Sequence, residues 1–504
     1  MTTISLSTII PPSPETVLQS GISGLDVVLA GGFTRNRLYL IEGMPGSGKT
    51  TLALQFLLEG LRKGETVLYV TLSETAQELR EVAASHGWTL EGIHIHELAP
   101  PHDSLDPDSH YTMFHPSEVE LGDTTKRIID QVSTLRPQRM VFDSLAELRL
   151  LAGSPLRYRR QVLALKQYFV GQNCTVLLLD DCASAEHGLH VHTIVHGTIT
   201  LSQLNPDYGG DRRRLRVTKF RGRRFSTGYH DYVIETGGLR VFPRLVAADH
   251  RRDVDQELIG SGSAEIDALF GGGLHRGTST LLIGAAGTGK SSLATSFAIA
   301  SAGRGEPAAI YTFDESERSH LMRSMGIGFD TNRYIESGML TVETVDPAEL
   351  SPGEFAHRIR HAVEHNGVRM VVIDSLNGYL NATPEERFML IQLHELLSYL
   401  AHHGVITILV SAQQGLIGTM TNAFDISYLA DAVVLLRYFE TQGEVRQAIS
   451  VLKKRTGGHE RTIRPFEITP NGLVIGEPLR HFRGVLTGVP HDRGDPPDEL
   501  RPLK

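Results

Sequence analysis

The feature that most constrains the fold of this chain is a glycine-rich loop that occurs twice. The first copy, GMPGSGKT, contains Lys49, and the second, GAAGTGKS, contains Lys290, an offset of 241 positions (290 − 49). The same offset relates Asp26 in GISGLDVVLAGG to Asp267 in GSAEIDALFGGG. A period of this length is that of a domain, because solenoid repeats recur every 20–50 residues or so. The sequence therefore predicts two copies of one domain.

The repeat continues downstream of the loops with small changes of offset. VLYVTLSET contains Glu74 and AIYTFDES contains Glu315, again 241 positions apart (315 − 74). RMVFDSL contains Asp143 and RMVVIDSL contains Asp374, which are 231 positions apart (374 − 143). A Lys-x-Arg pair then follows in both RVTKFRG and SVLKKRT. Loops that differ in length between the copies explain the drift.

The length of the chain agrees with a duplicated domain. A chain of 504 residues is too long for one hydrophobic core, since cores stop growing at about 250–300 residues. We place the first domain at residues 1–247 and the second at residues 248–489, because the polar stretch AADHRRDVDQE lies at this boundary. Residues 490–504 are rich in charge and proline, so we expect a disordered tail.

Each half alternates short apolar runs with segments of helical spacing. RLYLIEG, VLYVTL, RMVFDSL and TVLLLDD are strand candidates in the first half, and TTLALQFLLEGLRK has apolar residues at helical spacing. TLLIGAA, AIYTFD, RMVVIDSL, ITILVSA and SSLATSFAIASAGR are their counterparts in the second half. Continuous apolar strands separated by helices are typical of a mostly parallel sheet covered on both faces. The predicted fold class is therefore α/β in both halves.

Composition excludes several classes of protein. The net charge of −9 argues against a protein that simply coats nucleic acid. The two cysteines, Cys174 and Cys182, are too few for a disulfide framework and have no metal-ligand spacing. The N-terminus lacks the pattern of a signal peptide, and no run of about 18 apolar residues could span a membrane. We therefore expect a cytoplasmic protein that does not bind a membrane.

The loop pattern G-x-x-x-x-G-K-[ST], placed between a strand and a helix, is typical of a P-loop that binds the phosphates of ATP. Glycines let the backbone wrap closely around phosphates, and amides at the helix N-terminus face the negative charge. The alternative, a chance glycine turn, is disfavoured because the pattern occurs at two matched positions. The predicted ATP-binding residues are Gly43, Gly46, Ser47, Gly48, Lys49, Thr50, Thr51, Gly284, Gly287, Thr288, Gly289, Lys290, Ser291 and Ser292.

A P-loop ATPase also needs groups that hold Mg²⁺ and activate water. Thr50 and Ser291 would ligate Mg²⁺, and the strand-ending carboxylates of Asp143 and Asp374 would hold it through water. The alternative for these aspartates is a strand-end cap. Acids that follow the second predicted strand could lie beside the γ-phosphate, or they could be first-turn acids of a helix. These candidates for catalysis are Glu74, Asp314 and Glu315.

Two other clusters allow other interpretations. DRRRLRVTKFRGRRF, residues 211–225, could bind nucleic acid or form a solvated face, but the second half does not repeat its dense arginine run. HGLHVHTIVHG contains four histidines, of which His190 and His192 would share one face of a strand. No carboxylate or cysteine pattern accompanies them, and the second half lacks them, so zinc is disfavoured.

The duplicated P-loop, the acids after the second strand, the Asp-Ser pair and the late Lys-x-Arg resemble the KaiC family of RecA-like ATPases. The resemblance covers nearly the whole chain, from about Ser20 to Val489. It implies tandem RecA-like P-loop domains and an ATP-dependent homohexamer with nucleotide between subunits. It also implies a signalling or timing role, a KaiB-like partner and catalysis by Glu74 and Glu315. The residues that match those reaching the neighbour's γ-phosphate are Lys219, Arg221, Lys453 and Arg455.

The chain departs from the family pattern at the catalytic acids. Two adjacent glutamates are expected after the second strand of each half. This chain has Ser73 before Glu74, and Asp314 before Glu315. One alternative is therefore a ring in which the first half only binds ATP, while the second half hydrolyses it.

The second departure concerns the family's phosphorylated segment. Ser427 matches the serine, but Tyr428 and Asn422 stand where threonines are expected. Autophosphorylation on Ser427 by a serine/threonine autokinase stays open, as does an ordinary strand-edge or cap serine at this position. The proline-rich tail does not resemble one that recruits a stimulating partner. A DNA-handling motor with the same fold is the remaining alternative, and the acidic charge balance weighs against it.

Overall fold

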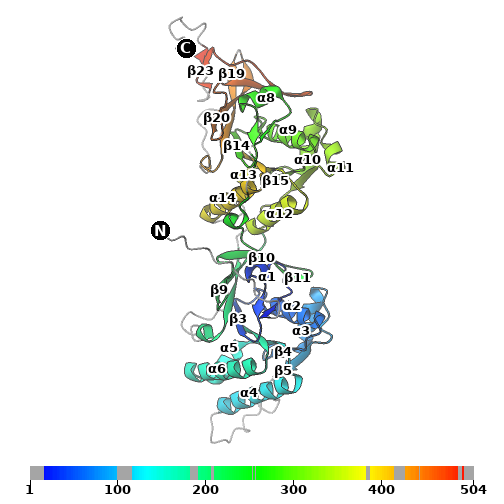
Figure 1. Ribbon diagram of the computed structural model, residues 1–504, viewed down its shortest axis with the longest axis vertical. Helices are drawn as coiled ribbons and strands as arrows, with labels where there is room; N and C mark the ends of the chain where they lie inside the picture. The colour runs from blue at the N-terminus through cyan, green and yellow to red at the C-terminus, as the bar shows by residue number, and fades with distance from the viewer. Residues whose placement is uncertain are drawn as a thin grey trace, which may run out of the picture. The chain divides into compact units, whose positions relative to one another are not determined.

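The computed structural model describes residues 16–98, 116–181, 191–205, 209–252, 254–255, 257–381, 386–413, 426–441, 443–485 and 491–492. The chain divides into two compact units, Met1–Arg244 and Leu245–Lys504 (Figure 1). Each unit contains one large sheet with helices around it.

The first unit is built on a nine-stranded sheet with the order β11-β10-β9-β8-β3-β7-β6-β4-β5. Strands β8 to β5 in this order pair in parallel, and β9, β10 and β11 add an antiparallel extension. The strands of the first unit, of which β1 and β2 form a separate pair, are β1 (Val17–Leu18), β2 (Phe33–Thr34), β3 (Leu38–Gly43), β4 (Val67–Thr71), β5 (His94–Glu97), β6 (Arg139–Asp143), β7 (Thr175–Asp181), β8 (Gly197–Leu204), β9 (Arg212–Phe220), β10 (Tyr229–Glu235) and β11 (Gly238–Phe242). Its helices are α1 (Leu25–Val28), α2 (Lys49–Arg62), α3 (Ala76–Ser85), α4 (Pro116–Leu135), α5 (Leu145–Ala152) and α6 (Pro155–Gly171).

The second unit repeats this plan with the strand order β16-β15-β17-β18-β14-β19-β20-β21-β22. Its strands are β12 (Leu258–Ile259), β13 (Leu274–His275), β14 (Ser279–Gly284), β15 (Ala308–Thr312), β16 (Leu340–Thr344), β17 (Met370–Asp374), β18 (Ile406–Ala412), β19 (Ala432–Thr441), β20 (Glu444–Lys454), β21 (Arg464–Thr469), β22 (Gly472–Ile475), β23 (Phe482–Arg483) and β24 (His491–Asp492). Its helices are η3 (Ala247–His250), α8 (Ala264–Leu269), α9 (Lys290–Gly303), α10 (Glu317–Gly326), α11 (Thr331–Glu336), α12 (Pro352–His365), α13 (Leu376–Asn381) and α14 (Glu386–His402).

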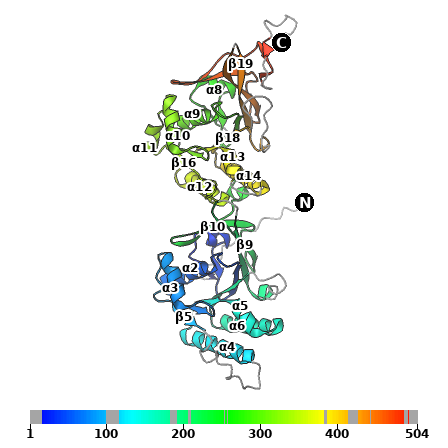
Figure 2. The same ribbon diagram turned by 180° about the vertical axis from the view of Figure 1, so that it is seen from behind.

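Both faces of each sheet are buried, because alternate residues of the central strands enter different cores. In β7, Leu177 belongs to one hydrophobic cluster of the first unit and Leu178 to the other. In β17, Val371 and Val372 divide in the same way between the two clusters of the second unit. Side chains that alternate across a strand need helices on both sides of the sheet (Figure 2). This confirms the predicted α/β fold with two mostly parallel sheets.

Two further observations bear on the sequence predictions. His491–Asp492, at the start of the predicted tail, pair with Phe482–Arg483, and the remainder of the tail lies outside the described residues. Among the helices that the structure describes, none is both long enough and apolar enough to cross a membrane.

Candidate nucleotide sites

The two glycine-rich loops have matching backbone geometry. Each leads from the central strand, β3 or β14, into a helix that begins at the loop lysine. Gly48 and Gly289 cap these helices with φ angles of 91° and 93°, in the left-handed region. A Cβ atom would also approach Ile234 Cδ1 at Gly48, or Phe466 Cε1 at Gly289, to 2.5 Å. Only glycine fits here, and the first amides of both helices have no side-chain cap, so they can bind an anion.

The loop lysines fold back on their own loops. Lys49 Nζ donates to the Gly43 carbonyl at 2.8 Å and forms an ion pair with Asp181 Oδ1, also at 2.8 Å. Lys290 Nζ donates to the Ala285 carbonyl at 2.6 Å. Burial lowers the pKa of Lys290 to about 8, against the opposing charge of Asp374. A phosphate would supply the negative charge that keeps this buried ammonium group protonated.

Asp143 and Asp374 are the last residues of β6 and β17, as the sequence suggests. Asp374 accepts a hydrogen bond from the hydroxyl of Ser291, so the two predicted Mg²⁺ groups of the second unit are already side by side. In the first unit, Tyr69 Oη donates to Asp143 Oδ2 at 2.6 Å and also contacts Thr50. Burial raises the pKa of both aspartates. The arrangement fits a hydrated Mg²⁺, whose charge would favour the ionised carboxylates.

Glu74 lies just beyond β4 with its backbone held and its carboxylate less constrained. Thr71 Oγ1 donates to the Glu74 carbonyl at 2.7 Å and accepts from the Glu74 amide at 2.9 Å. The carboxylate oxygen Oε2 is buried without a hydrogen-bond partner among the described residues. Burial raises the pKa of Glu74, and the negative charges of Asp143 and Glu78 raise it further. A half-buried carboxylate with a raised pKa has the properties of a general base.

The matching glutamate of the second unit is held by an arginine. Arg323 Nη2 lies 2.7 Å from Glu315 Oε2, and Arg323 Nη1 donates to Ser292 Oγ in α9 at 3.3 Å. The neighbouring Asp314 accepts a short hydrogen bond from Ser375. At the offset of 241, the residue that matches Arg323 is Val82 (323 − 241), so the first unit has no such clamp at this position.

The raised pKa of Glu74 predicts a pH effect. A carboxylate acts as a base only when ionised, so hydrolysis by the first unit should be lost as the pH falls through the raised pKa. Glu78→Gln removes a negative neighbour and should move this acidic limit of kcat/KM to lower pH. Because Glu78 is exposed and screened, we expect a shift of only a few tenths of a unit. Glu81→Gln, one turn along α3, is the matched control. If the acidic limit of kcat/KM moved equally in both variants, this would contradict Glu74 as the group that sets the limit.

The predicted trans residues of each unit bind a turn in their own unit. Lys219 Nζ donates to the Val195 carbonyl at 2.7 Å, and Arg221 Nη2 donates to the Thr193 carbonyl at 2.8 Å. In the second unit, Lys453 Nζ donates to the carbonyls of Ser427 and Ala430, both at 2.9 Å, and Arg455 Nη2 donates to that of Tyr428 at 2.6 Å. The two units thus place the Lys-x-Arg pair in the same local setting.

One expectation from the sequence is wrong. The sequence predicts a strand at His192, but residues 191–194 form a helical turn and the following strand begins at Gly197. Its Nε2 lies 3.0 Å from Glu42 Oε2, a carboxylate that β3 supplies from far away in the sequence. His187, His190, Cys182 and Asn422 lie outside the described residues.

Sequence reasoning missed Tyr69, Asp181 and Arg323 as parts of these sites. The two halves of the sequence differ at these positions, and these differences were the available signals. Tyr69 aligns with Ile310 (310 − 69 gives 241), and Arg323 aligns with a valine. Asp181 pairs with Gly43 in the sheet register, where the second unit pairs Gly284 with Ala412.

Comparison with known proteins agrees with this geometry. The family described as "ATPase: KaiC" matches residues 18–246 and again residues 259–480. The chain belongs to the KaiC ATPase family. It is 28% identical over 486 residues to the circadian clock protein KaiC3 of Synechocystis sp. (strain PCC 6803), with 94% of each chain covered. It is 26% identical over 485 residues to the circadian clock oscillator protein KaiC of Parasynechococcus marenigrum (strain WH8102), covering 94% of this chain and 93% of the relative.

These matches confirm the family resemblance that the motifs indicated. Membership of the KaiC family supports ATPase activity, with two ATP-binding P-loop domains in tandem.

Proposed function

We propose that this chain assembles into a homohexameric ring that binds ATP-Mg²⁺ at subunit interfaces and hydrolyses it. The observation that carries the proposal is the pair of loops whose uncapped helix amides and lysines form matching anion sites. The Lys-x-Arg pairs bind turns of their own unit, and a neighbouring subunit's phosphate is the anion we assign to them. A ligand that bridges two subunits stabilises the ring by mass action.

Each residue type then has a defined task. The loop amides with Lys49 and Lys290 would bind the phosphates, and the Mg²⁺ site would comprise Thr50 with Asp143 and Ser291 with Asp374. Mg²⁺ would neutralise charge on the phosphates. Glu74 would accept a proton from the attacking water. A trans cation such as Arg221 or Arg455 would stabilise the charge that develops on the transferred phosphoryl group.

The side-chain contacts favour hydrolysis chiefly by the first unit, the reverse of the division that Ser73 suggested. Glu74 has a carboxylate oxygen without a hydrogen-bond partner among the described residues and a raised pKa, whereas Glu315 is paired with Arg323. A carboxylate held in an ion pair is a weaker base, because the cation stabilises its ionised form. The second unit would therefore turn over more slowly.

Arg323→Val installs the residue found at the matching position of the first unit. In a Glu74→Gln background, where the second unit supplies the remaining turnover, this change should raise the ATPase rate about two- to five-fold. The effect is modest because a partly exposed ion pair contributes no more than about 1 kcal/mol. Phosphate release measured with and without the substitution checks this, and Arg318→Val on the same helix is the control. An unchanged or lower rate would argue against a restraining role.

A DNA motor with the same fold is the competing function. ATP turnover by the full chain should be measurable without any polymer and should change little when single-stranded DNA is added. A strong stimulation by DNA would favour the motor, and an absence of hydrolysis would contradict the proposal.

Autophosphorylation of Ser427 is a second candidate activity. Its carbonyl oxygen lies 2.9 Å from Nζ of Lys453, so the serine borders a predicted trans residue. We expect phosphate on Ser427 after incubation with ATP-Mg²⁺, detected by peptide mass spectrometry, and none in a Lys290→Ala variant. An unmodified segment around Ser427 would reject this activity.

The relatives are named as circadian clock proteins. A timing role is therefore part of the proposal, with a KaiB-like protein as partner.

A further inference from the structure

A cluster of two histidines and one glutamate lies near the start of the second unit and contains no residue of that unit's P-loop. His250 ends η3, Glu364 lies in the last turn of α12, and His403 directly follows α14. One ligand atom from each of the three side chains lies within 4.8 Å of the others. Residues from three separate segments thus bring metal-binding groups to one place.

His403 has an imidazole nitrogen that no described residue satisfies. Its Nδ1 lies 3.1 Å from the Tyr399 carbonyl oxygen. A carbonyl can only accept, so Nδ1 carries the proton and Nε2 presents a lone pair. The residue is only 7% exposed, and Nε2 is buried without a hydrogen-bond partner in the part of the chain that the structure describes. A buried unsatisfied acceptor is costly, and a backbone carbonyl on the other nitrogen is the usual support of a metal-binding histidine.

The other two ligands are also positioned. Glu364 Oε1 accepts from Tyr399 Oη and from Arg360 Nε, both at 3.0 Å, and these bonds leave Oε2 for a further partner. The segment that contains His250 is fixed on α14, because the Ala247 amide donates to Glu395 Oε2 at 2.9 Å.

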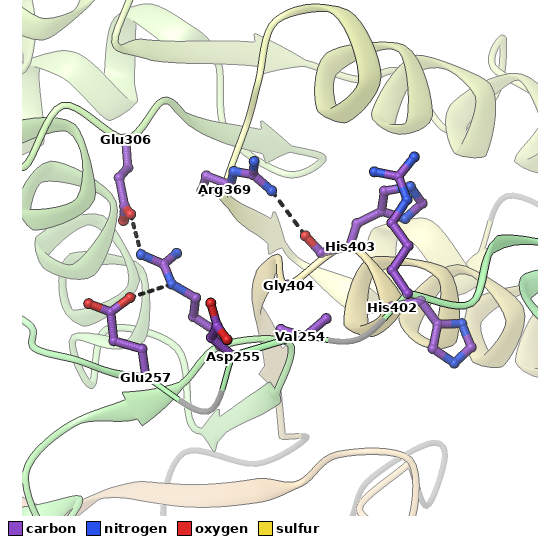
Figure 3. A pocket seen from close by; sticks show the side chains of 10 residues that line it. Val254, Asp255, Glu257, Glu306, Arg369, His402, His403 and Gly404 are labelled. Atoms are coloured by element: carbon purple, nitrogen blue, oxygen red, sulfur yellow. Dashed lines mark hydrogen bonds and ion pairs between the residues drawn. The ribbon is translucent and has the colours of Figure 1, made fainter.

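A cavity of about 470 Å³ borders His403, although His250 and Glu364 do not line it. Its lining includes His403 with Gly404, and Figure 3 shows Arg369 donating to the His403 carbonyl at its edge. Glu364 is exposed, so solvent reaches the cluster at this carboxylate.

We propose that His250, Glu364 and His403 bind a zinc ion, with water as the fourth ligand. Two imidazoles and one carboxylate suit zinc, whereas Mg²⁺ prefers oxygen ligands. Zinc bonds of about 2.0–2.2 Å separate tetrahedral ligand atoms by roughly 3.3–3.6 Å. Side-chain rotation therefore has to bring atoms that are 4.8 Å apart closer by about 1.2–1.5 Å. The ion would join the entry segment of the second unit to α12 and α14, independently of ATP hydrolysis.

Two cations oppose metal binding and limit its affinity. Arg360 contacts Glu364, and the charges of Arg360 and Arg252 both act on His250. An exposed histidine pair, His361 and His365, stacks on α12 with ring centroids 4.4 Å apart and offers a nonspecific site. The pair is therefore the matched control.

The test uses the full chain, stripped with a chelator and free of nucleotide, and titrated with zinc chloride against a competing zinc indicator. We expect one zinc per chain. His250→Ala and His403→Gln should each weaken the affinity at least about 10- to 100-fold, while the His361→Ala, His365→Ala double variant should keep it. Zinc should also raise the unfolding temperature of the parent chain and not that of His250→Ala.

The zinc titration is independent of the ATPase assays, because it uses the chain free of nucleotide. A stripped chain that takes up no zinc, or uptake that is unchanged in His250→Ala, would overturn the proposal. Uptake that is lost only in the histidine-pair control would assign the zinc to the exposed pair instead. His250 is half-buried at the end of a short helix, so His250→Ala decides the matter even if His403→Gln fails to fold.

Discussion

Glu74→Gln should reduce ATP hydrolysis by the full chain at least about 100-fold, the usual effect of losing a general base. Glutamine keeps the size of the side chain and the backbone hydrogen bonds to the Thr71 hydroxyl, but it cannot accept a proton from water. We expect a larger loss from Glu74→Gln than from Glu315→Gln. The reasons are the raised pKa of Glu74 and its Oε2 atom, which has no hydrogen-bond partner among the described residues. Nucleotide binding should persist, because Glu74 makes no part of the phosphate cradle.

Glu315→Gln is the matching change in the second unit, and its ATPase rate is compared with that of Glu74→Gln. Arg323 already pairs with Glu315, which makes this carboxylate a weaker base. Glu315→Gln should therefore lower the overall ATPase rate less than two-fold if the first unit dominates. Phosphate release at saturating ATP measures both variants. A larger loss from Glu315→Gln than from Glu74→Gln would reverse the assignment and support the division that Ser73 suggested.

The second large effect concerns the loop lysines. Lys49→Ala combined with Lys290→Ala should abolish measurable ATP binding, because truncating one partner of a buried charged contact costs about 2–5 kcal/mol per site. Each single variant should lose the nucleotide of its own unit and keep that of the other. Binding of a fluorescent ATP analogue, with its stoichiometry per chain, makes this distinction.

Lys63→Ala is the control for this pair of changes. Lys63 caps the same helix as Lys49 at its far end, where it pairs with Glu59. It should leave nucleotide stoichiometry unchanged. A double lysine variant that still binds two nucleotides per chain would contradict the assignment of both loops.

Much of the fold could be predicted because the chain carries its pattern twice. The loop glycines, the strand-ending Asp143 and Asp374 and the acids after the second strand all have local sequence signals, and a second copy removes most chance matches. The structure places these residues where the pattern suggested. What local pattern could not indicate was the contact between elements.

The missed residues depend on such contacts. Tyr69 reaches Asp143 because β4 and β6 are neighbours in the sheet. Arg323, in α10, reaches back to Glu315, which lies just before that helix. His192 was assigned to a strand since alternation in a short segment cannot distinguish a strand from a helical turn. His250 lies 114 positions before Glu364 (364 − 250), and His403 lies 39 positions after it (403 − 364), so no spacing rule could find the cluster.

Light scattering after size-exclusion chromatography, with and without a non-hydrolysable ATP analogue, tests the central claim most directly. A ring joined by shared nucleotide should elute as a hexamer when the analogue and Mg²⁺ are present. It should fall to smaller species without nucleotide, or in the double lysine variant. A chain that keeps the same mass under all of these conditions would contradict nucleotide-bridged assembly.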